Sequence, residues 1–163
     1  MALSQESVRV AVVEDDLLVR KAVARLLSSV GFDVSVFASA EEFLVRVDQS
    51  HPTCVLADVH LPRLSGLDLA AVLRELNRQL PFVFITADDT VANSDAMLRS
   101  GAACLTKPFE EERLLSALVR ASATAVSRLP GQNPSAFVTI NCQLPIPNPQ
   151  EWSLGSWVLE VGS

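Results

Sequence analysis

The chain has 163 residues, 49% of them hydrophobic, and a formal net charge of −6 at pH 7. This length suits one compact domain with a short extension, and no apolar run is long enough to span a bilayer. The acidic balance, without a cluster of Lys or Arg, argues against direct binding to nucleic acid. The first six residues lack the basic and apolar regions of a signal peptide, so we expect a cytoplasmic protein.

Short apolar, β-branched segments alternate with segments of helical period five times along the chain. In chain order we expect a strand at 8–13, a helix at 17–30, a strand at 33–37, a helix from 40 to about 48, a strand at 53–57, a helix from about 66 to 77, a strand at 81–86, a polar helix ending near 100, a strand at 102–105 and a helix at 110–125. This alternation predicts an α/β fold with a parallel sheet, right-handed crossovers and helices on both faces.

The ends of the first two predicted helices carry start and stop signals. Asp16 stands directly before the first helix, where a short acidic side chain favours an N-cap. Gly31 follows that helix at the C′ position, where a left-handed backbone favours glycine. Ser39 precedes the second helix and has Glu42 three residues later, which is the pattern of a capping box.

The cysteines indicate a reducing compartment. Cys54 and Cys104 fall in predicted strands that a third strand separates in the topology given below. Two strand spacings amount to roughly 9.5 Å, which is too far for a disulfide. We therefore expect reduced, structural cysteines, in keeping with a cytoplasmic protein.

The composition changes beyond about residue 127. Residues 130–163 carry five prolines, both tryptophans and two acids, but no Lys or Arg. We therefore expect a domain at 7–127 and a Pro-rich tail at 128–163, too short for an independent domain. The stretches 137–142 and 157–161 have strand-like sequences. Two interpretations of the tail remain open, a disordered segment or a hairpin docked on its own domain or on a partner.

Polar side chains stand at the ends of four of the five predicted strands. They are Glu14, Asp15 and Asp16 after the first strand, Asp58 after the third, Thr86 at the end of the fourth and Lys107 after the fifth. The carboxyl ends of parallel strands meet at one edge of the sheet, where such folds perform their chemistry. We therefore expect these side chains to gather there.

This set of residue types suits phosphoryl transfer. Three carboxylates at one point repel each other unless a hard cation with oxygen ligands, usually Mg²⁺, holds them together. A lysine adds a fixed positive charge and a threonine adds a hydrogen-bond donor, so the edge predicts in-line transfer to Asp58 on the central strand. Taken singly, each residue has a plainer interpretation, such as a helix cap or a loop carboxylate. We retain that interpretation for Asp16 alone.

Four motifs resemble those of the bacterial response-regulator receiver domain of two-component signalling. They are Val12-Val13-Glu14-Asp15-Asp16, Asp58-Val59-His60-Leu61-Pro62 with Gly66, Ile85-Thr86-Ala87 and Thr106-Lys107-Pro108-Phe109. The segment 37–44 is similar to that of receivers of the nitrogen-fixation-regulator type. The resemblance covers about residues 7–125 and implies a doubly wound, five-stranded flavodoxin-like (βα)₅ sheet of strand order 2-1-3-4-5, followed here by the Pro-rich tail.

The resemblance also implies roles for individual residues. It makes Asp58 the phosphoacceptor, with Thr86 and Lys107 contacting the transferred group. Glu14, Asp15, Asp58 and the main-chain carbonyl of His60 would hold one Mg²⁺, Glu14 acting largely through water. Such a domain is a phosphoacceptor rather than a dedicated enzyme, although it assists its own phosphorylation and dephosphorylation.

Two departures from the family pattern concern signalling rather than phosphorylation. Receivers usually carry Tyr or Phe three residues before the lysine, where this chain has Cys104, and the interval from Gly101 to Lys107 is one residue shorter than usual. In addition, the tail has neither the length, the helical period nor the basic residues of a helix-turn-helix domain.

The predicted function is therefore that of a single-domain response regulator phosphorylated by a sensor histidine kinase. The family implies an output to a protein target, or self-dimerisation, through the fourth helix, fifth strand and fifth helix. The alternative is the receiver part of a transcriptional regulator whose DNA-binding domain is absent from this chain. A binding-only pseudo-receiver is disfavoured by the complete site, and a dehalogenase-type hydrolase by His60 where a second acid is required.

Two further hypotheses concern residues around the site. The Lys107–Pro108 bond is expected to be cis, because the chain turns sharply there while the lysine points inward. His60 and Asp88 flank the site two residues beyond Asp58 and Thr86, so they are candidates to tune the lifetime of the phosphorylated form. The alternative, that both are ordinary loop residues, is held equally.

Overall fold

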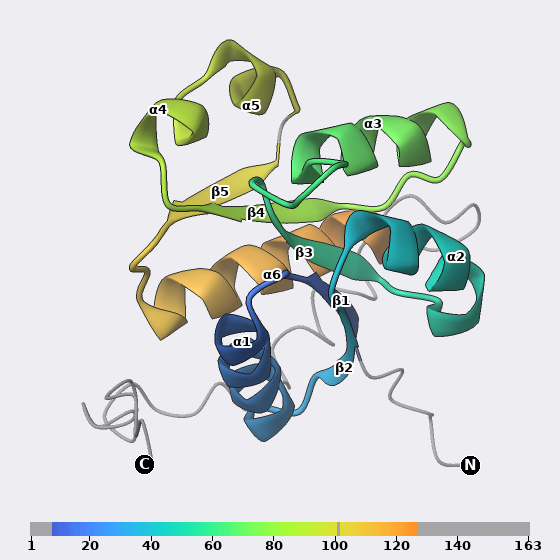
Figure 1. Ribbon diagram of the computed structural model, residues 1–163. Helices are drawn as coiled ribbons and strands as arrows, with labels where there is room; N and C mark the ends of the chain where they lie inside the picture. The colour runs from blue at the N-terminus through green and yellow to red at the C-terminus, as the bar shows by residue number, and fades with distance from the viewer. Residues whose placement is uncertain (1–7, 101, 127–163) are drawn as a thin grey trace.

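The computed structural model describes residues 8–100 and 102–126, so the predicted tail at 128–163 lies outside the described residues. Five strands alternate with helices in this part of the chain (Figure 1). The elements are β1 (Arg9–Val13), α1 (Leu17–Ser29), β2 (Asp33–Phe37), α2 (Ala40–Ser50), β3 (Cys54–Asp58), α3 (Gly66–Glu75), β4 (Phe82–Thr86), α4 (Asp89–Ala92), α5 (Asp95–Ser100), β5 (Ala103–Thr106) and α6 (Glu111–Val126).

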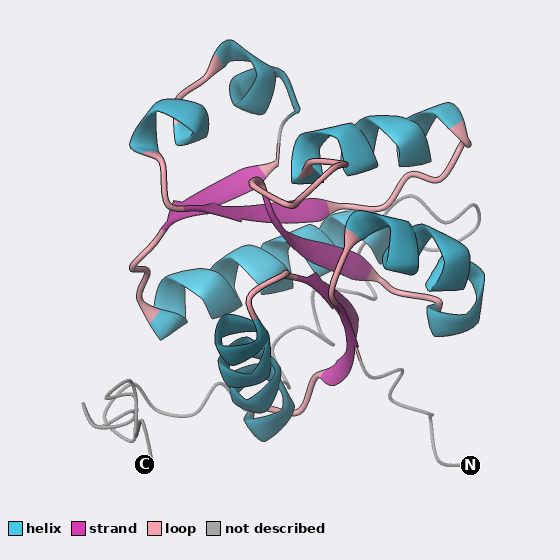
Figure 2. Cartoon of the chain, viewed as in Figure 1, coloured by secondary structure: helices cyan, strands magenta, loops and turns pink. Residues whose placement is uncertain are grey.

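The strands form one parallel sheet in the order β2-β1-β3-β4-β5, which confirms the predicted fold class and strand order. Helices cover both faces (Figure 2). Successive side chains of a strand point to opposite faces, so Val12 packs with α1 and α6, whereas Val13 packs with α2 and α3. Both sides of the central strands are therefore buried, as their continuous apolar runs require.

The signals at the ends of α1 form as predicted. The Asp16 carboxylate accepts hydrogen bonds from the main-chain N–H groups of Leu18 and Val19 at 2.8 and 3.1 Å. At the other end Gly31 has a φ of 97°, and the next N–H bonds back to the Leu27 carbonyl at 3.1 Å. These bonds satisfy backbone groups that a helix end leaves open.

The predicted capping box of α2 is only half correct. Ser39 Oγ accepts from the N–H of Glu42 at 3.1 Å, but the Glu42 carboxylate accepts from Ala38, not from Ser39. A complete reciprocal box occurs instead at α3, where Ser65 and Asp68 each accept a hydrogen bond from the other's main-chain N–H. An acid at the third position of the helix thus forms the box there.

The single polar helix predicted before residue 100 is wrong, because the segment forms two short helices, α4 and α5. Asn93 donates a side-chain hydrogen bond to the Asp89 carbonyl at 2.9 Å at the end of α4. Ser94 Oγ then accepts from the N–H of Met97 at 3.3 Å, in the manner of a new N-cap. Short polar side chains that bond the backbone in this way interrupt a helix.

The other predicted boundaries agree with the structure to within two residues, and one of the differences bears on the site. Strand β3 extends to Asp58, so the candidate acceptor is the last residue of the strand rather than the first of the loop. Helix α3 ends at Glu75, shortly before Asn77 adopts a left-handed φ of 57°.

Cys54 and Cys104 are free thiols on β3 and β5, separated by β4 as expected. None of the described helices has the length and apolar character of a membrane span.

Candidate functional site

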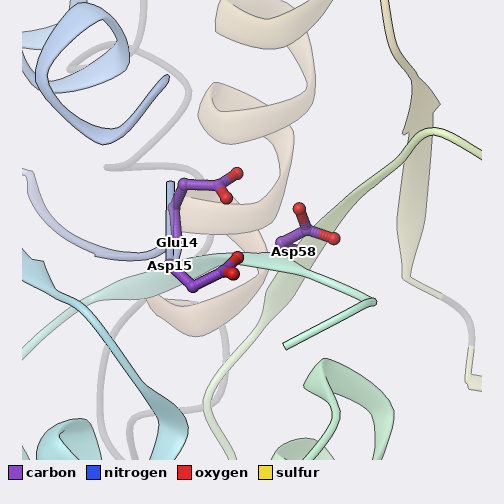
Figure 3. Close-up of side chains that lie close together, drawn as sticks. All are labelled: Glu14, Asp15 and Asp58. Atoms are coloured by element: carbon purple, nitrogen blue, oxygen red, sulfur yellow. The ribbon is translucent and has the colours of Figure 1, made fainter. Parts of the chain in front are cut away.

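Three carboxylates meet at the carboxyl edge of the sheet. Glu14 and Asp15 follow β1, and Asp58 ends the neighbouring strand β3. One oxygen of each lies within 4.8 Å of the others, and the three side chains face a common space (Figure 3). Glu14 and Asp58 are buried, whereas Asp15 is exposed and has no hydrogen-bond or ion-pair partner for its carboxylate among the described residues.

Lys107 provides positive charge to this cluster and directly follows β5, the strand at the opposite end of the sheet from β2. Its Nζ donates to Asp58 Oδ2 at 2.7 Å and to Glu14 Oε2 at 3.0 Å. The main chain of Lys107 is fixed by a 2.7 Å bond from its N–H to the Thr86 carbonyl. The Lys107–Pro108 peptide is cis, as predicted. One ammonium thus bridges two of the three acids.

Burial and mutual contact shift the protonation equilibria of this pair. Burial raises the pKa of Glu14 to about 7, the hydrogen bond from Lys107 opposes that rise, and the nearby Asp58 charge adds to it. Burial also acts to lower the pKa of Lys107, but its hydrogen bonds to Asp58 and Glu14 outweigh this and hold the pKa above its usual value. The lysine is therefore a permanent cation in the site.

Arg20 on α1 fixes the loop that carries the first two acids, a role that the sequence analysis missed. Its guanidinium Nη1 donates to the main-chain carbonyls of Glu14 and Asp15 at 2.6 and 3.2 Å. The N–H of Glu14 bonds the Phe37 carbonyl of β2 at 3.1 Å. The available signal was a basic residue one turn into a helix that starts beside the strand end.

The candidate acceptor Asp58 is held from two sides. Its second oxygen, Oδ1, accepts from the main-chain N–H of His60 at 2.8 Å. Gly66, the first residue of α3, lies so close that a Cβ at this position would collide with the Asp58 carbonyl oxygen. Only glycine permits this approach without a shift of the backbone, so Gly66 sets the position of β3 against α3.

Thr86 stands next to this cluster on β4. Asp58 pairs with Ile85 in the sheet register, and Thr86 is the following residue, fully buried at the strand end. Its Oγ1 accepts from the N–H of Asp88 at 3.1 Å and donates no hydrogen bond within residues 8–100 and 102–126. The hydroxyl hydrogen therefore has no acceptor among these residues.

His60 and Asp88 both flank the site, and their proposed effect on the phosphorylated form stays a prediction. The Asp88 carboxylate is the N-cap of α4 and accepts from the N–H and Oγ1 of Thr90 at 2.8 and 2.6 Å. Those bonds, chiefly the one from the Thr90 hydroxyl, lower the pKa of Asp88. The His60 side chain is exposed, as expected. Asp88 therefore has a structural role that the sequence analysis did not assign.

The donor set fits a hard divalent cation. The site offers three carboxylates against one ammonium, so it retains negative charge. Its ligand atoms are all oxygens, which Mg²⁺ prefers. Glu14, Asp15 and Asp58 are the residues that would hold the ion; the predicted use of the His60 carbonyl stays a prediction.

Comparison with known protein families identifies the family to which the chain belongs. The family model of the response regulator receiver domain matches residues 10–119, which is more than half of the chain. The chain belongs to the response regulator receiver family. The matched range contains every residue that the sequence analysis assigned to the site.

Individual relatives agree with this assignment. The receiver is 36% identical over 117 residues to the response regulator protein TodT of Pseudomonas putida, covering 71% of this chain and 52% of TodT. It is 40% identical over 114 residues to nodulation protein W of Bradyrhizobium diazoefficiens, covering 69% and 50% of the two chains. The chain therefore spans about half the length of these relatives.

Among solved structures, the receiver is similar to the crystal structure of FixJ-N. The TM-score is 0.67 at 29% identity, and the match covers 78% of this chain and 99% of that one.

Cys104 stands at the position where the receiver pattern usually has Tyr or Phe. Cys104 pairs with Phe84 in the register of β4 and β5 and is half-buried against the core on the α2 and α3 face. A small thiol thus stands where the family pattern has an aromatic ring.

Proposed function

We propose that this receiver accepts a phosphoryl group on Asp58 from the phosphohistidine of a sensor histidine kinase, in a Mg²⁺-dependent reaction. The observation that carries the proposal is the position of Asp58, a buried strand-end carboxylate contacted at 2.7 Å by Lys107 and grouped with Glu14 and Asp15. A buried acid with a fixed cation and two more acids beside it is costly to maintain without a ligand. Phosphoryl transfer uses all four groups.

The transfer requires few chemical steps of the protein. An oxygen of Asp58 forms a bond to phosphorus as the phosphorus–nitrogen bond of the donor breaks, and the imidazole leaves with the electron pair. When bound, Mg²⁺ would supply positive charge to the phosphoryl oxygens. Lys107 Nζ already lies at 2.7 Å from an Asp58 oxygen, within reach of an oxygen of the attached group. The free hydroxyl hydrogen of Thr86 suits a second such contact.

Loss of the phosphoryl group closes the cycle. Water attacks phosphorus, the bond to the Asp58 oxygen breaks, and inorganic phosphate leaves. The exposed side of the site, marked by Asp15 and His60, is where this water enters. This makes the domain a self-assisting phosphoacceptor that works as a switch.

The switched surface is the one that includes β5 and its neighbouring helices. In the structure the predicted output face consists of α4 and α5, which replace the single fourth helix, together with β5 and α6. Thr86 precedes α4, and Lys107 follows β5, so both contacts of the phosphoryl group lead into this face. A protein target or a second receiver would bind there. The free thiols of Cys54 and Cys104 agree with a cytoplasmic setting.

Intact-mass spectrometry tests the proposal directly. Incubation with acetyl phosphate and Mg²⁺ should add one alkali-labile phosphoryl unit, and Asp58→Ala should remove that gain. Asp16→Asn is the matched control, because it deletes a neighbouring carboxylate but keeps a competent N-cap. Labelling of Asp58→Ala equal to that of the native chain, or labelling undiminished in EDTA, would exclude the proposal.

A second candidate function is the receiver part of a longer transcriptional regulator. The observation that favours it is length, since this chain spans about half of TodT and of nodulation protein W. A reading frame that continues into a basic helical domain would support it. DNA binding by such a longer product, enhanced by phosphorylation of Asp58, is the measurement that separates it from a stand-alone receiver.

A further inference from the structure

A groove of about 890 Å³ lies along the free edge of the sheet at β5. Among the described strands β5 pairs only with β4, so one of its edges has no strand beside it. Side chains of α3 and the loop after it line one wall of the groove, and one face of α6 lines the other. Nothing in the phosphorylation chemistry uses this groove, because the site lies at the carboxyl ends of the strands.

The lining of the groove combines small apolar side chains with arginines. Leu80, Pro81 and residues 102–104 provide partly exposed apolar surface. Four arginines and a single acid, Glu112, also line it; the arginines are Arg74, Arg78, Arg113 and Arg120. Arg78 is paired with Asp48 and Arg120 makes an interaction of its own, so the docking charge comes from Arg74 and Arg113, which are both exposed. A ligand for such a surface is apolar or aromatic and carries negative charge.

The chain itself contains a segment of this chemistry. Between residues 150 and 161 lie both tryptophans, Trp152 and Trp157, and two acids, Glu151 and Glu160. The same segment has no Lys or Arg. Its aromatic rings match the apolar lining, and its carboxylates match the arginines. An unpaired strand edge also invites an added segment of chain.

The point at which the tail starts favours the chain's own segment over a separate partner. Groove-lining residues on α6 extend to Ala121, five residues before the helix ends at Val126. Trp152 lies 26 residues beyond Val126, and a coil of that length spans on the order of 28 Å. The lining face of α6 from Glu112 to Ala121 is only about 14 Å long. A tethered segment with this reach is present at millimolar effective concentration.

We propose that the chain's own segment 150–161 docks in the groove between α3 and α6 along β5. Docking places the indole rings of Trp152 and Trp157 on the apolar lining and the two acids beside the arginines. The docked segment would cover part of the face that includes β5 and α6. The inference does not depend on phosphorylation of Asp58, and its test needs no phosphodonor.

Tryptophan fluorescence of the full chain provides the test, because the protein has two tryptophans, both in this segment, and no tyrosine. In the native protein we expect emission shifted to the blue of that in urea, with weaker quenching by acrylamide. The double variant Arg74→Glu/Arg113→Glu should lower the ratio of docked to undocked chains by roughly tenfold. Its emission and quenching should then approach those of the unfolded chain.

The matched control is Lys21→Glu/Arg25→Glu on α1, which makes the same change in net charge at exposed positions outside the groove. Its emission should equal that of the native chain. If the groove variant fails to fold by circular dichroism, Ala103→Glu at an exposed position of β5 makes the same test. Native emission equal to that in urea would overturn the proposal. So would a blue shift that disappears on dilution together with a dimer, because a second copy would then be the occupant.

Discussion

Lys107 contacts two acids that differ in burial, and this arrangement gives it a structural role besides the one proposed in phosphoryl transfer. The side chain of Glu14 is 1% exposed, that of Asp58 9% and that of Lys107 24%. Without the ammonium, Glu14 would be a buried charge with no cation. Its protonation would then be the only way to reduce the cost of burial.

Lys107→Met should therefore destabilise the metal-free protein by about 1–3 kcal/mol, less than for a fully buried pair because the lysine is partly exposed. Adding Glu14→Gln to that variant should recover much of the loss, because the more deeply buried of the two uncompensated charges is gone. Urea denaturation in EDTA of the four proteins of this cycle measures the coupling. Strictly additive losses would show that the two groups do not stabilise each other.

We expect a steric effect of substitution at Gly66, and the same substitution at Gly31 serves as the comparison. A Cβ at Gly66 would collide with the Asp58 carbonyl. A Cβ at Gly31 would lie in open space, and a substitution there is strained only by the backbone φ of 97°. Gly31→Ala should cost about 1 kcal/mol of stability and leave phosphorylation intact. Gly66→Ala should cost about 1–3 kcal/mol and slow phosphorylation, since the acceptor strand must shift. Equal effects of the two substitutions on labelling would contradict this interpretation.

We expect Arg20 to rigidify the loop that carries Glu14 and Asp15, an effect that a measurement of activity alone would not reveal. Arg20→Met removes the donor to the carbonyls of Glu14 and Asp15, so amide hydrogen exchange at residues 14–16 should become faster. Loss of a charged hydrogen bond of this kind corresponds to about 1.5–3 kcal/mol of local protection. Arg25→Met, at an exposed position of the same helix, is the control. Unchanged exchange in the Arg20 variant would show that other contacts hold the loop.

At the scale of the elements, the sequence predicted what depends on burial and missed what depends on local polar bonds. The strands were found because the central ones are apolar up to their last residue, as the run at 82–85 in β4 illustrates. The break between α4 and α5 was missed because hydrophobic periodicity does not register the side-chain bonds of Asn93 and Ser94 to the backbone. The same reason explains why the capping box was placed at Ser39 rather than at Ser65.

The candidate site was likewise predicted in part from the sequence. Strand-end position and motif spacing sufficed to gather Glu14, Asp15 and Asp58, since parallel strands align their ends. The contact between Lys107 and Glu14 and the role of Arg20 were not predicted. They depend on side-chain reach across strands and loops, which spacing in the sequence does not encode.

Helix α4 offers a test of the two residues that flank the site. Asp88→Ala removes the N-cap of this four-residue helix, which should cost about 1 kcal/mol and speed amide exchange in 89–92. His60→Ala leaves the cap intact. Dephosphorylation rates of both variants show whether either side chain tunes the lifetime of the phosphorylated form. If only Asp88→Ala changes the rate, in step with exchange, the helix rather than the carboxylate is responsible.

For the whole molecule, Mg²⁺ should raise stability, because the folded chain gathers ligands that the unfolded chain does not. At ten times the dissociation constant the gain is about 1.4 kcal/mol, which thermal unfolding at increasing Mg²⁺ concentration measures. Asp15→Asn should abolish the response, and should stabilise the metal-free protein slightly by relieving repulsion. Asp16→Asn should respond as the native chain does. A response of equal size in the Asp15 variant would place the ion elsewhere.

The bridge from Lys107 to Asp58 and Glu14 spans 49 and 93 residues of sequence. During synthesis the acid loop and the acceptor therefore leave the ribosome well before their shared cation. A nascent chain that ends before residue 107 has the three acids but lacks the Lys107 ammonium that contacts two of them. Under the proposed function, a chain that has not yet reached residue 107 would therefore be unable to accept a phosphoryl group on Asp58.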